Sequence, residues 1–149
     1  MSSVVATIRA GIETRAAAVL TGWSRLRFVH VLDRNTLSGE DQRYGVRVTD
    51  GVQVPGAVCA YTLDHSFEVI LARAYITTVD GDAVWDTIVD DLEQKAHSLF
   101  TDLVQQKAGA ASVVNNVKDL VLLEPEVDED NKFIALRVRF AVNYRVSTL

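Results

Sequence analysis

The segment that most constrains the fold of this chain is the last predicted strand, residues 133–146. Apolar side chains occupy every second position of it: Ile134, Leu136, Val138, Phe140, Val142, Tyr144 and Val146. The positions between them carry Phe133, Ala135, Arg137, Arg139, Ala141, Asn143 and Arg145. Because successive side chains of a strand point to opposite faces, this alternation predicts a long strand with one apolar face and one arginine-bearing face.

The length of this strand adds a second constraint. A strand of about 13 residues spans roughly 43 Å at ~3.3 Å per residue. A compact domain of 149 residues has a radius of gyration near ~15 Å and a diameter of about 38 Å. No glycine or proline interrupts the strand, which disfavours a sharp bend. We therefore expect another subunit to cover part of its apolar face, as in an oligomer bridged by this strand or its hairpin.

The composition is typical of one globular domain, residues 1–149. Hydrophobic residues make up 48% of the chain and charged residues 23%. The net charge of −5 argues against a general nucleic-acid binder, which needs basic surface. The single cysteine, Cys59, excludes an intrachain disulfide. No apolar run approaches the ~20 residues that a bilayer requires, and we expect no signal peptide, so the chain is expected to be made and used in the cytoplasm.

Two segments have helical periodicity. Thr21-Gly22 is a typical helix end after residues 3–20. Within that segment the apolar positions recur at spacings of three and four: Val5, Ile8, Ile12, Ala16 and Val19. A longer helix is predicted from Asp80-Gly81-Asp82 to about Gln106, with Asp82 as its N-cap and a clear apolar stripe: Trp85, Ile88, Leu92, Ala96, Leu99 and Leu103. Its acidic residues are expected on a solvated face: Asp90, Asp91, Glu93 and Asp102.

Strand patterns fill most of the remaining chain, over residues 26–32, 43–49, 66–78 and 120–123 as well as 133–146. Residues 66–78 are apolar on both faces, which indicates a central strand covered on two sides. Between the strands we expect a loop over 33–42, a turn at Asp50-Gly51, an irregular or edge segment over 52–60, a linker over 108–116 and an acidic turn over 124–132. The predicted fold is α+β: a mixed, largely antiparallel sheet packed against an N-terminal helix and one long central helix, closing with a C-terminal β-hairpin.

Catalytic and metal-binding patterns are missing from the sequence. It contains no phosphate loop, nucleophile elbow, zinc motif or paired cysteines. Asp64-His65-Ser66 holds the residue types of a triad, but neighbouring residues of a strand point to opposite faces and cannot align. The acidic run 128–131 lacks the glycine and distal glutamate of a calcium loop. We expect neither enzymatic activity nor a metal or other cofactor.

The basic stripe of the last strand is the one candidate site. Arg137, Arg139 and Arg145 share a face, which is either a solvated sheet surface or a surface that binds carboxylates of a partner through bidentate contacts.

The closing hairpin also carries a family resemblance. Residues 120–126 are Leu-Val-Leu-Leu-Glu-Pro-Glu, an acidic turn follows, and residues 133–145 are Phe-Ile-Ala-Leu-Arg-Val-Arg-Phe-Ala-Val-Asn-Tyr-Arg. Together with the order of helix, strands, long helix and hairpin, this resembles the tail terminator (tail completion, head–tail joining) proteins of tailed bacteriophages. The aromatic–arginine ending, Tyr144-Arg145, is the most suggestive local part and adds Tyr144 to the candidate interface residues.

The resemblance implies a structural virion protein of the tail or neck, assembled in the host cytoplasm. Such a protein forms a ring, usually a hexamer, that caps the tail tube when the tube has reached its length. The ring then presents a surface to the head-side connector or stopper protein, and genomic DNA passes through its lumen without sequence-specific contact. An acidic protein suits that passage, since a basic lumen would retain DNA. The alternatives are another connector, neck or stopper-like protein, a tube-like or injection-system protein, and a small ligand-binding or enzymatic α+β domain.

Overall fold

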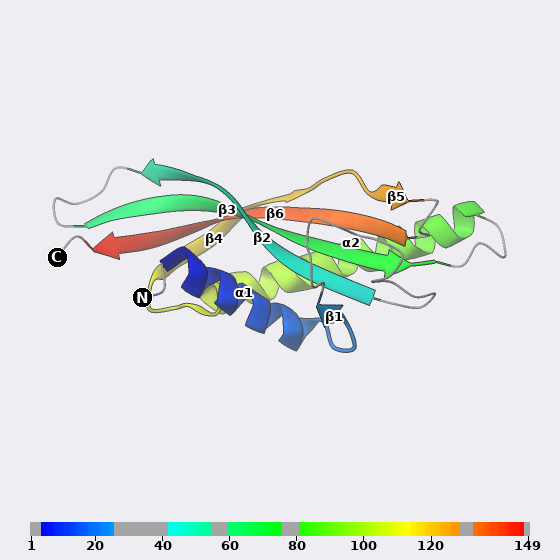
Figure 1. Ribbon diagram of the computed structural model, residues 1–149, viewed down its shortest axis with the longest axis horizontal. Coiled ribbons are helices and arrows are strands. Elements are labelled where there is room, and N and C mark those ends of the chain that lie inside the picture. Colours follow the sequence, from blue (N-terminus) through cyan, green and yellow to red (C-terminus); the bar gives the residue numbers. More distant parts are fainter. Residues whose placement is uncertain (1–3, 26–41, 55–59, 76–80, 129–132, 148–149) are drawn as a thin grey trace.

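The computed structural model describes residues 4–25, 42–54, 60–75, 81–128 and 133–147 (Figure 1). Its elements in chain order are α1 (Val4–Val19), β1 (Ser24–Arg25), β2 (Gln42–Val54), β3 (Ala60–Ala74), α2 (Gly81–Gln105), η1 (Lys107–Gly109), β4 (Val114–Leu122), β5 (Glu126–Asp128) and β6 (Phe133–Ser147). The α+β class and the closing β4–β6 hairpin are confirmed.

The sheet has the strand order β1-β2-β3-β6-β4, and the short β5 pairs with β6 beyond β4. All pairings are antiparallel except the two-residue contact of β1 with β2. β3 lies between β2 and β6 and pairs with β6 from Ala60↔Ser147 to Ala74↔Phe133 without a register shift. β3 is therefore a central strand of the sheet, as predicted, but the helices pack on only one of its two faces.

Both helices pack on one face of the sheet. The predicted stripe of α1 is buried at Ile8, Ile12 and Ala16, and that of α2 at Ile88, Leu92, Ala96, Leu99 and Leu103. The strands meet these helices with the alternating apolar residues that the sequence indicates, including Tyr44, Val46, Phe67, Val69, Leu71, Ile134, Leu136, Val138, Phe140 and Val142. A two-layer core results on this side of the sheet, and a smaller buried apolar cluster lies on the opposite side: Ile70, Ala72, Phe133 and Ala135.

A close backbone contact joins α1 to η1. Gly109 adopts a φ of +69°, and a Cβ added to it would lie 2.8 Å from the carbonyl oxygen of Gly11. A Cβ at Gly11 would in turn collide with the carbonyl oxygen of Ala108. Glycine is needed at both positions, since any side chain would separate the two segments. Gly22, with a φ of +84°, follows α1 as expected for its predicted end.

Several predicted boundaries are wrong. Asp50-Gly51 is not a turn: β2 continues through it with a register shift between Val48 and Gly51, because pairing with β3 goes on as far as Val54↔Thr62. β3 starts at Ala60 rather than at 66. β4 starts within the predicted linker, and β5 lies within the predicted acidic turn. In each case pairing with a neighbouring strand overrides local turn signals. The predicted strand over 26–32, residues 33–41 of the loop predicted over 33–42, and the Asp82 cap lie outside the described residues or side chains. Gln42, the last residue of that predicted loop, begins β2.

The length of β6 is accommodated differently from what the sequence led us to expect. β6 does not bend sharply, and its length does not by itself require a second subunit. The molecule is not spherical but elongated along its twisted sheet, so a strand of this length fits within one chain (Figure 1). The paired ends of β2, β3 and β6 near the C-terminus extend past both helices in this view. Leu63 and Val146, on the helix side of these ends, are only partly buried.

Candidate interface on the open face of the sheet

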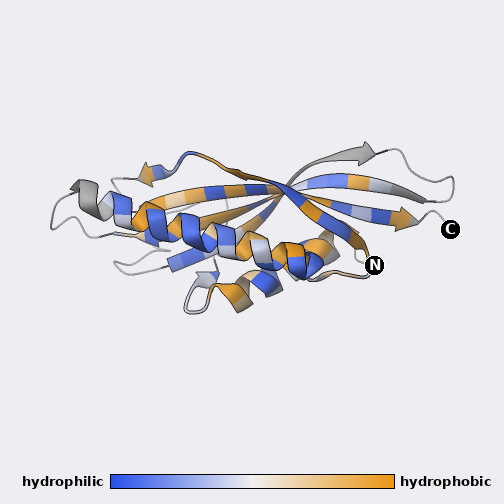
Figure 2. Ribbon diagram, turned by 180° about the vertical axis from the view of Figure 1, so that it is seen from behind, coloured by the Kyte–Doolittle hydropathy of each residue, from blue (hydrophilic) through white to orange (hydrophobic). Residues whose placement is uncertain are grey.

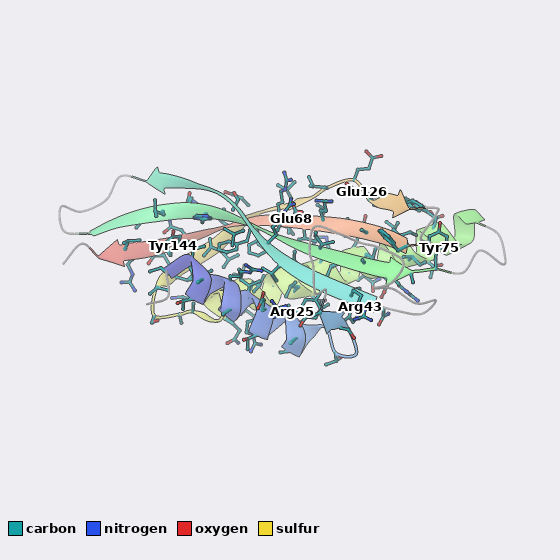
Figure 3. The ribbon with its side chains drawn as sticks, in the orientation of Figure 1. Arg25, Arg43, Glu68, Tyr75, Glu126 and Tyr144 are labelled. Carbon is teal, nitrogen blue, oxygen red and sulfur yellow. The ribbon has the colours of Figure 1, made fainter. Side chains whose placement is uncertain are left out.

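The face of the sheet turned away from the helices carries a charged cluster. Its members alternate with core residues along their strands: Arg47 lies between Val46 and Val48 in β2, Glu68 between Phe67 and Val69 in β3, and Arg137 and Arg139 flank Val138 in β6. The register places Arg47 and Arg139 opposite Glu68 on its two sides. Figure 3 shows Glu68 near the middle of the long sheet.

Three guanidinium groups hold the one carboxylate. Arg139 donates from Nε to Glu68 Oε2 at 2.8 Å. Arg47 Nη2 and Arg137 Nη1 each donate to Glu68 Oε1 at 3.1 Å. Donors from both neighbouring strands thus converge on the carboxylate, and we call these four residues the arginine cluster. The bond from Arg139 has the length typical of a strong charge-assisted hydrogen bond, about 2.7–2.9 Å, and the other two are slightly longer.

Glu68 is fully buried although it lies on the helix-free face. Burial alone raises the pKa of its carboxyl group, but the hydrogen bond from Arg139 and the charges of Arg47, Arg137 and Arg139 outweigh burial and lower that pKa. The carboxylate is therefore ionised at neutral pH and neutralises one of three positive charges.

The arginine cluster keeps an excess of positive charge and of N–H donors. Arg139 is 47% exposed, and Arg47 and Arg137 are each 27% exposed. Glu126 of β5, 60% exposed, lies 3.4 Å from Arg137 Nε and offsets one further charge. Among the described residues no acceptor bonds the buried Nε atoms of Arg47 and Arg137. These two Nε atoms are buried and are not accessible from outside, but the exposed part of Arg139 can receive additional carboxylate or phosphate oxygens.

A polar row lies on the same face, nearer the C-terminal end of β6. Asn115 donates to Asn143 at 2.8 Å, Asn143 donates to Asp64 at 2.6 Å, and Lys118 Nζ lies 2.9 Å from Asp64 Oδ2. Burial raises the pKa of Asp64, but the bonds from Asn143 and Lys118 lower it overall. These groups satisfy one another, so the row stabilises the β3–β6–β4 pairing.

The structure separates the four predicted interface residues. Arg137 and Arg139 join the cluster around Glu68. Arg145 is exposed further along β6, and its Nη2 lies 3.4 Å from the carbonyl oxygen of Ser112. Tyr144 points to the opposite face and is 2% exposed in the core, with its hydroxyl 3.5 Å from His65 Nδ1. Within one chain Tyr144 therefore has little surface to offer a partner.

Sequence reasoning missed Glu68 and Arg47. The available signal was a lone acid within an otherwise apolar segment, since Glu68 interrupts the run from Phe67 to Ala72. Such an acid on a strand covered on both sides requires a cationic partner. Which cation would supply it depends on strand register, and the arginine of β2 could not be assigned without that register.

The acidic side of α2 is less uniform than predicted. Arg15 binds Asp102 through two bonds of 2.8 and 2.7 Å, and Arg73 binds Asp91 at 3.1 Å. These two carboxylates connect α2 to α1 and to β3, so they are not free solvated groups as the sequence predicted. Asp86, Asp90 and Glu93 remain at spacings of four and three, which places them on one side of the helix. Figure 2 shows hydrophilic bands along the outer side of α2.

Within the described parts of the chain, no group of three or more His, Cys, Asp or Glu side chains is placed to hold a metal ion. The helices described there include none with the length and apolar character needed to cross a membrane.

No protein-family model and no curated protein matches this sequence. Among solved structures, the chain is similar to one chain of the virion of a native gene transfer agent particle. The TM-score is 0.47 with 13% sequence identity, over 97% of this chain and 100% of that chain.

Proposed function

We propose that this protein is a structural subunit of a tailed-phage-type particle, a tail terminator. Copies of it form a ring, of six subunits in the family it resembles, on the head-proximal end of the tail tube. The ring stops tube growth and joins the tail to the head-side connector, and DNA passes through its lumen without sequence-specific binding. The proposal assigns the chain no catalytic role and no cofactor.

The observation that carries the proposal is the extension of β2, β3 and β6 past the helix layer (Figure 1). Leu63 and Val146 belong to the apolar face of the sheet, but no second layer closes over them as it does over Phe140 or Val142. A sheet end with a half-covered apolar face gains stability when a neighbouring subunit packs on it. The order of elements, which the structure confirms, adds support through the resemblance to tail terminators.

Electron microscopy of the purified protein, alone and mixed with assembled tail tubes, tests the proposal. We expect rings of uniform diameter, and tubes mixed with the protein should carry a density at one end and stop growing. Rings that bind only isolated connectors would favour the stopper or neck alternative. Discrete monomers that leave tube length unchanged would refute the proposal.

A further inference from the structure

The helix layer and the sheet of this molecule expose surfaces of opposite charge. The arginine cluster lies on the outer face of the sheet, where the carboxylates of Glu68 and Glu126 face three guanidinium groups and leave one positive charge in excess. The acidic stripe, Asp86, Asp90 and Glu93, lies on α2, on the side away from its buried stripe. Among the described residues none of these three carboxylates forms an ion pair.

We propose that the arginine cluster of one copy binds the acidic stripe on α2 of a second copy. The proposal rests on the proposed function, because it names the contact between neighbouring subunits of the ring. Free guanidinium N–H groups on one side and unpaired carboxylates on the other form bidentate, charge-assisted contacts. The exposed part of Arg139 is the best placed of the three to make the first contact.

The position of the two surfaces determines the kind of assembly. They lie on opposite sides of the two-layer molecule, so a contact between them joins different patches of the two copies. Such a head-to-tail contact cannot satisfy both copies in a two-fold dimer. It leaves one free surface at each end of a growing chain, which becomes a ring when the rotation between copies closes and an open filament when it does not. The charge pattern of one subunit is thus compatible with the ring that the proposed function requires.

The test uses full-length variants and mass photometry across a concentration series. Asp90→Lys combined with Glu93→Lys changes one exposed and one half-buried side chain of α2, and it should raise the concentration needed for half-assembly by about tenfold or more. Arg139→Glu should have a similar effect. The combination of all three substitutions in one chain should restore assembly, because the charges of the two surfaces are then exchanged.

Matched controls separate this contact from a general change of charge. Arg9→Glu on α1 alters a side chain of similar exposure, 43%, and Glu124→Lys alters an exposed acid outside α2. Both should assemble like the wild type. Thermal melting checks the fold of every variant, since Arg139 also binds Glu68. If Arg139→Glu does not fold, the α2 variant and a loss of wild-type assembly at high salt still decide the question.

The outcomes distinguish the inference from the proposed function. Rings that persist in the folded Arg139→Glu and α2 variants overturn the inference and leave the terminator function standing. A wild type without rings and without effect on tubes overturns the proposed function and the inference with it. If the Arg139→Glu variant still forms rings but no longer binds duplex DNA, the arginine cluster binds phosphate groups and the inference is overturned as well.

Discussion

At the scale of single residues, Glu68 organises the open face of the sheet. A fully buried carboxylate is stable there only because three arginines from the adjacent strands donate to it. The same arrangement keeps the guanidinium groups of β2 and β6 together despite their mutual repulsion. The cluster is therefore a structural tie and a charged surface at once.

Glu68→Gln should destabilise the protein by about 1–3 kcal/mol, because it leaves three guanidinium groups around a neutral amide that can accept fewer bonds. Urea unfolding followed by circular dichroism measures the change. Glu126→Gln is the matched control, since that carboxylate is 60% exposed and contributes little. Equal stability of the two variants would contradict the role assigned to Glu68.

The contribution of Glu68 should also depend on pH with a definite sign. Its pKa is lowered in the folded protein, so the unfolded chain takes up the proton first as the pH falls. The stabilisation is complete above the unfolded pKa of about 4.3 and is lost as the pH falls through the folded pKa. The stability difference between wild type and Glu68→Gln should therefore shrink at acidic pH, as urea unfolding at pH 7 and at lower pH can show.

Alanine substitutions at two glycines near the helices should destabilise the protein to different degrees. Gly11→Ala should destabilise the fold strongly, by about 2 kcal/mol or more, because the new Cβ collides with backbone of Ala108 and Gly109. Gly22→Ala places its Cβ in open space and should cost only the strain of a positive φ, roughly 1 kcal/mol. Thermal unfolding compares the two, and a Gly22→Ala variant as unstable as Gly11→Ala would contradict the packing argument.

At the scale of elements, β6 carries the fold. It pairs with β3 over its whole length and with β4 and β5 on its other side, and its alternate residues fill the core. The amphipathic alternation of β6 was predictable because it is local. The starts of β3 and β4 were not, because they depend on which strand lies alongside.

Truncation after Asn131 should abolish cooperative folding, because it removes β6 and leaves β3, β4 and β5 without their common partner. Expression of the fragment followed by thermal melting measures this. Removal of residues 148–149 alone is the control and should leave the melting transition unchanged. A soluble fragment 1–131 with a sharp transition would show that β6 is an appendage.

At the scale of the whole molecule, the double role of the arginine cluster in folding and in assembly determines how the interface can be tested. The sequence alone suggests a test in which the charges of Arg137 and Arg139 are both reversed. In the structure both residues bind Glu68, so this variant would weaken the fold and any assembly together. Substitutions on α2, which leave the cluster intact, separate the two effects.

The shape itself can be measured in solution. A compact chain of 149 residues has a radius of gyration near ~15 Å. Small-angle scattering of a dissociated variant, such as Asp90→Lys with Glu93→Lys, should give a clearly larger value because the sheet extends past the helices. The wild type measured at the same low concentration is the reference. A value at the compact limit would contradict the extension of β2, β3 and β6.

The sequence by itself determined the periodic features: the stripes of α1 and α2, the alternation of β6, the two apolar faces of β3 and the α+β class. Each of these follows from the spacing of side chains along one element, which is a local property. Only the tertiary structure decided the register that brings Arg47 and Arg139 to either side of Glu68, the burial of Tyr144 and the elongation that accommodates β6. These depend on which strands pair and in what alignment, and backbone hydrogen bonds between distant segments decide that.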